Sequence, residues 1–327
     1  MILKKIKVIC TVGPSSLNKQ FLNFANKNID LLRLNMSHLN LVDLEKSINF
    51  IRKYSDVPIC IDTEGAQIRT KINKKKILKL GEKVSITNEK KFSLYPKNVR
   101  KQLRLNDILN IGFDNLKIKI IKKNKNIIGK VISSGKLENN KGVHLENRKI
   151  NLEYLTKKDF SAIEIGKKLN IKHYALSFTN SVNDIKKFNK LLKDNYKIFK
   201  IETLNACKNF KDILKYGDHF LIDRGDLSKY VKIENIPIVQ RDLFKFKEKY
   251  INKEIFVATN LLESMLENNF PTRGEANDIF NSLEMGSKGL VLAAETAIGR
   301  NPISSVKFLK NMIKVFKNSK YKKSKYF

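Results

Sequence analysis

Two residues of opposite charge, Lys200 and Glu202, stand two positions apart where a short apolar run ends. Side chains two apart on a strand point to the same face, so both would enter the same surroundings. A buried ion pair recovers its desolvation cost only when its geometry is excellent. We therefore favour a functional interpretation, in which Glu202 binds a divalent cation and Lys200 neutralises charge on a transferring group. A purely structural ion pair is the alternative.

A second candidate metal ligand, Asp226, follows the apolar run 219–222 on a turn that also contains Gly225. Backbone N–H groups of such a turn can hold an anion. Two carboxylates with open coordination positions suit Mg²⁺, which keeps waters and accepts substrate oxygens. Thr259 would add a hydroxyl at the end of the run 254–258, although a threonine there is often only a helix cap.

Two further segments carry polar side chains directly after apolar runs. Arg33, Asn35 and Ser37 are two apart, so a strand that continues through them would point a phosphate-binding guanidinium and two oxygen ligands the same way. Asp62 ends the run 57–62, where a carboxylate is costly unless it is paired or bound to a metal. Structural alternatives remain open for both: an N-cap with a buried arginine salt bridge, and an aspartate capping the next turn.

Short apolar runs of strand length would position these residues. There are eight, at 6–11, 29–34, 57–62, 173–178, 197–201, 219–222, 254–258 and 289–292. Most intervening segments carry apolar residues three and four apart, which predicts amphipathic helices, and Pro302 suits a first helical turn. Eight strand and helix units favour a closed (β/α)₈ TIM barrel, an α/β fold with its active site at the C-terminal ends of the strands. An open doubly wound sheet is the alternative, but no glycine-rich nucleotide motif occurs.

One stretch, 71–150, interrupts this rhythm with short apolar runs separated by Lys, Asn and Gly. It reads as an inserted all-β cap domain. Removing these 80 residues from the 327 leaves 247, close to the roughly 250 residues of a (β/α)₈ barrel. We therefore expect residues 1–70 and 151–327 to form the barrel.

The composition narrows the class of partner. Lys and Arg number 65 against 32 Asp and Glu, a formal net charge of +33, which suits an anionic partner. The basic residues are spread evenly and lack interleaved aromatics, so they do not indicate nucleic-acid binding; a biased base composition of the gene explains them as well. The three cysteines form no metal or disulfide pattern. No run is long and apolar enough for a signal peptide or membrane span, so we expect a cytoplasmic protein.

Taken in order, these segments and several others resemble pyruvate kinase. The matching motifs are Cys10-Thr11-Val12-Gly13-Pro14-Ser15-Ser16, Arg33-Leu34-Asn35-Met36-Ser37-His38, Lys141-Gly142-Val143, Lys200-Ile201-Glu202, Arg224-Gly225-Asp226-Leu227, Leu262-Glu263-Ser264-Met265, Pro271-Thr272-Arg273 and Glu295-Thr296-Ala297. The resemblance implies an enzyme that transfers the phosphoryl group of phosphoenolpyruvate to ADP, giving pyruvate and ATP in glycolysis. The insertion would be the family's mobile cap, which excludes water on closing.

The resemblance also implies site residues. Glu202 and Asp226 would hold Mg²⁺ or Mn²⁺, and Gly225 with Asp226 would contact the substrate. Lys200 would stabilise the phosphoryl transition state and the enolate, and Thr259 would lie near the carbon that is protonated.

The remaining implied roles concern phosphate, nucleotide and potassium. Arg33 would grip the transferring phosphoryl group. The nucleotide would lie along Asn35, His38, Arg69 and Lys141. A K⁺ ion, as a second cofactor, would be bound by Asn35, Ser37, Asp62 and the carbonyl of Thr63.

The chain departs from the family pattern at several positions. Gln67 replaces a glutamate that accompanies potassium dependence, and Asp223 replaces a small residue near the expected substrate carboxylate, where a negative charge is electrostatically awkward. His144 and Asn180 replace an asparagine and an arginine. Slow turnover or altered substrate handling could follow from these changes.

The chain stops after the helix that follows Pro302, where the family continues into a C-terminal allosteric domain. We therefore expect no sugar-phosphate activation, and a homodimer or monomer. One alternative function is a Mg²⁺-dependent aldolase-type lyase acting on pyruvate-like acids, which would not need phosphate-binding cations such as Arg33 and Lys141. The other is a catalytically impaired remnant kept as a cationic scaffold, against which the joint presence of Lys200, Glu202 and Thr259 argues.

Overall fold

The computed structural model describes residues 5–86, 91–112, 116–124, 126–146, 148 and 150–319. The chain divides into two compact units, one formed by residues up to Glu64 and from Lys157 onwards, the other by Gly65–Thr156. The second unit extends six residues beyond the predicted 71–150 on each side. The boundary lies further out because strand β4 (Ile68–Ile72) already pairs within this unit and Leu152 packs on its core.

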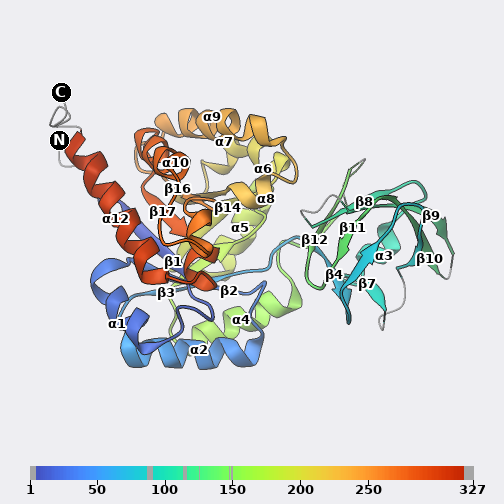
Figure 1. Ribbon diagram of the computed structural model, residues 1–327, viewed down its shortest axis with the longest axis horizontal. Helices are drawn as coiled ribbons and strands as arrows, with labels where there is room; N and C mark the ends of the chain where they lie inside the picture. Colours follow the sequence, from blue (N-terminus) through green and yellow to red (C-terminus); the bar gives the residue numbers. More distant parts are fainter. Residues whose placement is uncertain are drawn as a thin grey trace. The chain divides into compact units, whose positions relative to one another are not determined.

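Eight parallel strands close into a barrel in the order β1-β17-β16-β15-β14-β13-β3-β2 (Figure 1). Their bounds are β1 Lys7–Thr11, β2 Leu31–Asn35, β3 Ile59–Asp62, β13 His173–Leu176, β14 Tyr196–Ile201, β15 His219–Asp223, β16 Glu254–Ala258 and β17 Gly289–Leu292. Each bound lies within two residues of its prediction, and the (β/α)₈ fold class is confirmed. Strands of such a barrel are buried on both faces and therefore read as continuous apolar runs.

Helices surround these strands in Figure 1, and their buried stripes match the predicted spacing. The longer helices are α1 Lys19–Asn28, α2 Leu41–Tyr54, α4 Lys157–Lys168, α5 Val182–Leu191, α9 Ile236–Glu248, α10 Arg273–Glu284 and α12 Pro302–Ser319. Shorter helical turns are α6 Leu204–Lys208, α7 Phe210–Ile213, α8 Arg224–Leu227, α11 Ala294–Ala297, and the 3₁₀ turns Ile233–Asn235 and Glu263–Leu266. Pro302 opens α12 as predicted, and Thr272 and Glu275 form a capping box at the start of α10.

The second unit is built almost wholly of antiparallel strands. A seven-stranded sheet runs in the order β6-β10-β9-β8-β12-β4-β7, and β11 pairs with β5. The bounds are β5 Lys76–Leu78, β6 Lys83–Ser85, β7 Phe92–Tyr95, β8 Ile108–Ile111, β9 Leu116–Lys123, β10 Ile127–Ser133, β11 Gly135–Leu137 and β12 Gly142–Leu145. A single short helix, α3 (Val99–Gln102), occurs among the described residues of this unit.

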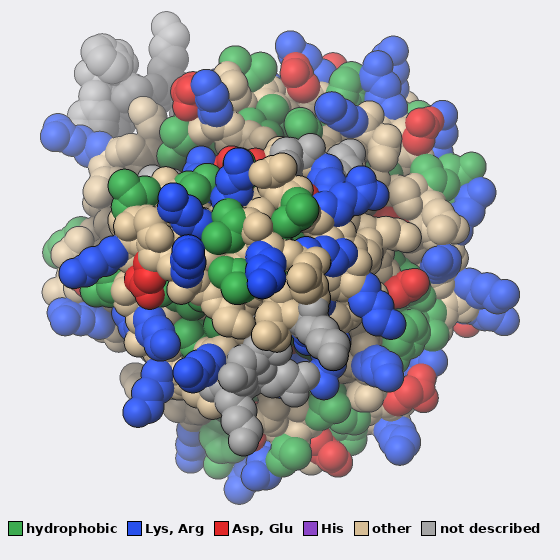
Figure 2. Space-filling model, turned by 90° about the vertical axis from the view of Figure 1, so that its right-hand side faces the viewer, with side chains coloured by type: hydrophobic (Ala, Val, Ile, Leu, Met, Phe, Trp, Pro, Cys, Tyr) green, Lys and Arg blue, Asp and Glu red, His purple; other side chains and the backbone are tan. Residues whose placement is uncertain are grey.

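The basic surplus is visible as scattered side chains. Figure 2 shows Lys and Arg distributed between apolar and neutral residues over one face, without a single concentrated patch. Within the described part of the chain, no helix combines the length and apolar character needed to cross a lipid bilayer.

Candidate active site

The residues expected to carry chemistry form one polar layer inside the barrel. Below it lies an apolar layer that includes Ile9, Leu31, Cys60, Ala175, Ile198 and Leu221. Two residues further along each chain segment, and therefore on the same inward face, come Thr11, Arg33, Asp62, Ser177, Lys200 and Asp223. All six are buried. Because parallel strands all end at one rim, the layer lies at the C-terminal ends, where barrel enzymes carry their active sites.

Lys200 is surrounded by carboxylates. Its Nζ lies 2.8 Å from Oε1 of Glu202, 3.3 Å from Oδ2 of Asp62 and 3.4 Å from Oδ2 of Asp223. Burial by itself lowers the pKa of Lys200, but Asp62 and Glu202 outweigh it and raise that pKa above its ordinary value. The ammonium therefore stays protonated.

Arg33 and Asp62 form a buried pair beside this ammonium. Nε and Nη2 of Arg33 each lie 2.6 Å from Oδ2 of Asp62, and Nη1 donates to Oγ1 of Thr11 at 2.9 Å. Oδ1 of Asp62 accepts from the Ser177 hydroxyl at 3.1 Å. Although burial raises the pKa of Asp62, Arg33 and Lys200 lower it below its usual range. The neighbouring cations thus offset the cost of burying the Asp62 carboxylate. The buried arginine salt bridge, left open as the structural alternative for Arg33, is present.

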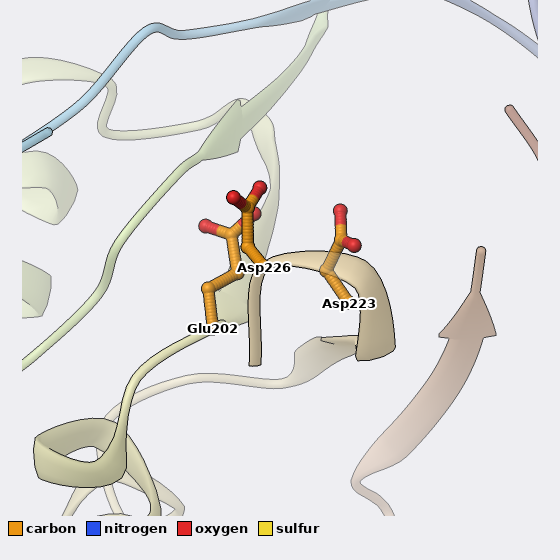
Figure 3. Close-up of side chains that lie close together, drawn as sticks. All are labelled: Glu202, Asp223 and Asp226. Atoms are coloured by element: carbon orange, nitrogen blue, oxygen red, sulfur yellow. The ribbon is translucent and has the colours of Figure 1, made fainter. Parts of the chain in front are cut away.

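Glu202, Asp223 and Asp226 could together hold a metal ion. One oxygen from each lies within 4.8 Å of the others, and Figure 3 shows Glu202 beside Asp226 with Asp223 to one side. Glu202 Oε2 accepts from the backbone N–H of Phe178 at 2.6 Å. Burial, together with Asp223 and Asp226, raises the pKa of Glu202 against the lowering effect of Lys200. A set of carboxylate oxygens at the end of two neighbouring strands fits Mg²⁺ or Mn²⁺.

Thr259 is fixed at the rim by both its hydroxyl and its carbonyl. Oγ1 accepts from the N–H of Gly225 at 2.8 Å and lies 3.1 Å from Oδ1 of Asp223. The carbonyl accepts from Nη2 of Arg224 at 2.6 Å. The backbone φ of Thr259 is 68°, a left-handed conformation that is costly for a β-branched residue. Such strain persists only where the surroundings hold it, as Arg224 and Gly225 do here.

The strand that carries Arg33 and Asn35 does not continue through Ser37. Strand β2 stops at Asn35, and Ser37 lies in the following turn. Oδ1 of Asn35 accepts from the N–H of Ser37 at 3.0 Å, so a side chain takes over from the strand's backbone pairing. His38 in the same turn is exposed. The hydroxyl of Thr63, which directly follows β3, donates to the carbonyl of Ala175 on β13 at 3.1 Å.

The two basic residues predicted to bind the nucleotide from the insertion come together within the second unit. Arg69 on β4 pairs with Gly142 on β12, which directly follows Lys141. Nη1 of Arg69 donates to the carbonyl of Asn140 at 3.2 Å, and Nζ of Lys141 lies 3.0 Å from Oε2 of Glu138.

Sequence reasoning missed two side chains that contact the candidate ligands. Ser177 Oγ lies 3.3 Å from Nζ of Lys200, and Nζ of Lys229 lies 2.6 Å from Oδ1 of Asp226. Spacing offers a signal for both, because Ser177 follows Ala175 by two on the inward face and Lys229 follows Asp226 by three on a helical turn.

Two glutamates, Glu275 and Glu295, accept hydrogen bonds from neighbouring loop residues. Both carboxylate oxygens of Glu275 accept hydrogen bonds from Ser264, one from its N–H at 2.7 Å and the other from its hydroxyl at 2.5 Å. Glu295 accepts from the N–H groups of Leu262 and Ala293. These contacts agree with the alternative that rim Thr and Glu residues act as caps.

Comparison with known proteins gives one family. The model of the pyruvate kinase barrel domain matches residues 3–306. The pyruvate kinase of Methanocaldococcus jannaschii is 34% identical over 320 residues, covering 96% of this chain and 70% of that protein. That of Thermotoga maritima is 31% identical over 331 residues, covering 95% and 71%. For that of Staphylococcus epidermidis the identity is 32%, with 95% of this chain and 56% of the relative covered.

The match runs through both compact units and includes the strands that end in the polar layer. Relatives more than 30% identical, matched along over two thirds of their own length, share more than a fold. This chain therefore belongs to the pyruvate kinase family, whose members are phosphotransferases.

Proposed function

We propose that this chain transfers the phosphoryl group of phosphoenolpyruvate to ADP in glycolysis, forming pyruvate and ATP with the help of a divalent cation. The observation that carries the proposal is the buried ammonium of Lys200, held 2.8 Å from Glu202 beside the other acidic residues. Phosphoryl transfer demands positioning and charge neutralisation above all, and a fixed cation next to a metal site supplies both.

Glu202 and Asp226 would hold Mg²⁺ or Mn²⁺ through oxygen ligands. When bound, the cation neutralises negative charge on substrate oxygens. Lys200 keeps its proton among the carboxylates and would present it to the phosphoryl oxygens and then to the enolate. Arg33, oriented by Asp62 through two nitrogens, would contact the transferring group with a geometry that matches phosphate.

Thr259 would work at the carbon that is protonated to give pyruvate. Its hydroxyl is already fixed between Gly225 and Asp223, so it can accept and pass on a proton without first losing rotational freedom. Gly225 and Asp226 would contact the substrate through the turn that they share, because a backbone N–H there can donate to an anionic oxygen.

The nucleotide and potassium assignments are further parts of this proposal. Asn35, His38, Arg69 and Lys141 would line the nucleotide, and Asn35, Ser37, Asp62 and Thr63 would bind K⁺. A potassium ion would have to share Asp62 with Arg33 and Ser177, and Asn35 with the N–H of Ser37. Together with Gln67, this favours weak potassium dependence. We also propose a cytoplasmic location and a homodimer or monomer.

A lactate-dehydrogenase-coupled assay tests the proposal directly. Pyruvate should form only when phosphoenolpyruvate, ADP and Mg²⁺ are all present, and omission of K⁺ should reduce the rate only slightly. Lys200→Ala should lower kcat by about 10²-fold or more, as expected when a principal charge-stabilising group is lost. Lys215→Ala serves as the matched control, because this lysine is an exposed partner of Asp212.

Two other outcomes would replace the proposal. Release of a keto acid without ADP would identify an aldolase-type lyase. Intact Mg²⁺ binding with no phosphoryl transfer in either direction would identify an impaired remnant.

A further inference from the structure

Asp223 lies among the proposed catalytic groups, and the proposed metal pair of Glu202 and Asp226 does not include it. Its side chain is only 7% exposed, with Oδ1 3.1 Å from the Thr259 hydroxyl and Oδ2 3.4 Å from Nζ of Lys200. It ends strand β15 and precedes Asp226 by three residues, so both carboxylates belong to one short segment. A charged side chain buried there must be stabilised by specific neighbours.

The distances among the three carboxylates suit a shared cation. One oxygen each from Glu202, Asp223 and Asp226 lies within 4.8 Å of the others (Figure 3). Two oxygens on opposite sides of an octahedral Mg²⁺ are about 4.2 Å apart, and adjacent ones are about 3 Å apart. Small side-chain movements would therefore bring all three onto one ion.

Glu202 also has an oxygen available for such an ion. Oε1 is completely buried and makes no hydrogen bond among the described residues, and its close contact is the ion pair with Lys200. The other oxygen, Oε2, is used by the N–H of Phe178. A carboxylate oxygen has more than one lone pair, so Oε1 could face a metal ion while it keeps its contact with Lys200.

The charge balance points to Asp223 as the residue that attracts the cation. Four carboxylates are in contact with three cations here, and the set comprises Asp62, Glu202, Asp223 and Asp226 with Arg33, Lys200 and Lys229. The cluster is left with one negative charge in excess. Removing Asp223 would leave it balanced, and carboxylate count is a main determinant of affinity for hard divalent cations.

We propose that Asp223 is a third carboxylate ligand of the divalent cation, beside Glu202 and Asp226. The inference rests on the proposed metal centre at Glu202 and Asp226. It concerns a residue that replaces the small side chain of the family pattern.

Titration of the full chain with Mn²⁺, without substrate, tests this ligand. Asp223→Asn keeps the size and a hydrogen-bond acceptor for Thr259 but removes the charge, and it should weaken Mn²⁺ binding by about tenfold or more. Asp278→Asn is the control, because it removes the same charge from the partner of Arg224 near the rim without touching the three carboxylates. The control should change the Mn²⁺ affinity by less than about twofold.

Unchanged or tighter Mn²⁺ binding in Asp223→Asn would overturn the inference. Glu202→Gln separates it from the proposed function: if this variant loses Mn²⁺ and Asp223→Asn does not, the metal centre stands and the third ligand is rejected. If neither variant affects Mn²⁺ binding, the metal centre itself fails. Water-proton relaxation of the wild-type Mn²⁺ complex gives a measurement independent of any variant, because three protein ligands leave about three bound waters on an octahedral ion. About four waters would exclude Asp223.

Discussion

Replacement of Lys200 by methionine separates its part in folding from its part in catalysis. The substitution keeps most of the length of the side chain but removes the ammonium that lies 2.8 to 3.4 Å from three carboxylates. Asp62 keeps Arg33 as a partner, whereas Glu202 and Asp223 lose their nearest cation. We expect both stability and activity to fall, for different reasons.

The loss in the free energy of unfolding can be estimated from the contacts. Removing one partner of a buried ion pair costs about 3–5 kcal/mol, because a buried charge is left uncompensated. Glu202 can relieve part of this by taking up a proton once Lys200 is gone, since burial raises its pKa and Lys200 is the neighbour that lowers it. We therefore expect Lys200→Met to lose about 3 kcal/mol, the lower end of that range.

The double variant Lys200→Met with Glu202→Gln tests the reasoning. Both charges are then gone, and replacing a whole buried pair with neutral groups of similar volume is often close to neutral, so most of the lost stability should return, to within about 1 kcal/mol of wild type. Activity should stay absent, because neither the cation nor a metal ligand is restored. Lys215→Met, an exposed control, should change stability by less than about 0.5 kcal/mol.

Urea unfolding followed by circular dichroism, with the coupled assay on the same samples, measures both quantities. The electrostatic account is refuted if the double variant is no more stable than the single one. Full activity in Lys200→Met would equally refute the catalytic role.

Three further predictions concern other parts of the barrel. Arg33→Lys loses the two-nitrogen contact with Asp62, so kcat should fall at least about tenfold in the coupled assay while Mn²⁺ affinity is retained. Burial and Lys7 lower the pKa of His219 below its ordinary value of 6.5, against the raising effect of Glu254. Neutral His219 therefore stabilises the folded state fully above pH 6.5, and this stabilisation is lost as the pH falls through the lowered pKa. Melting curves between pH 7.5 and 5 should show this decline, and His219→Gln should flatten it. Thr272→Ala removes the cap of α10 and should lower stability by about 1 kcal/mol in urea unfolding.

The barrel could be predicted from sequence because its strands are buried on both faces. Runs such as Ile255–Val257 have no polar interruption, and a charged pair such as Lys200 and Glu202 therefore stands out. The turn after β2 could not be predicted in this way, because Asn35 hydrogen-bonds to the backbone of Ser37 and the turn has no apolar signature. The assignments of cation, substrate and nucleotide ligands remain proposals.

Side chains that act through their neighbours were harder to find. Ser177 reads in the sequence as an ordinary residue after a strand, and its contacts with Asp62 and Lys200 exist only because three strands converge at one rim. Asp223 looked awkward as a lone carboxylate near a substrate carboxylate. Its partners, Lys200 and Thr259, come from the strands on either side of β15, and spacing along a single segment cannot reveal them.

The local charge of the site opposes the charge of the whole chain, and this difference bears on the order of binding. A formal net charge of +33 attracts anionic substrates over long range, whereas the polar layer, with Asp226 and Lys229, carries one excess negative charge. An anionic substrate arriving at the metal-free site would meet repulsion at short range, where solvent screens little. Binding of a divalent cation converts that excess to one positive charge. On the proposed function, prior binding of the cation should therefore favour binding of phosphoenolpyruvate, and Asp223, as a proposed ligand, would contribute to that preference.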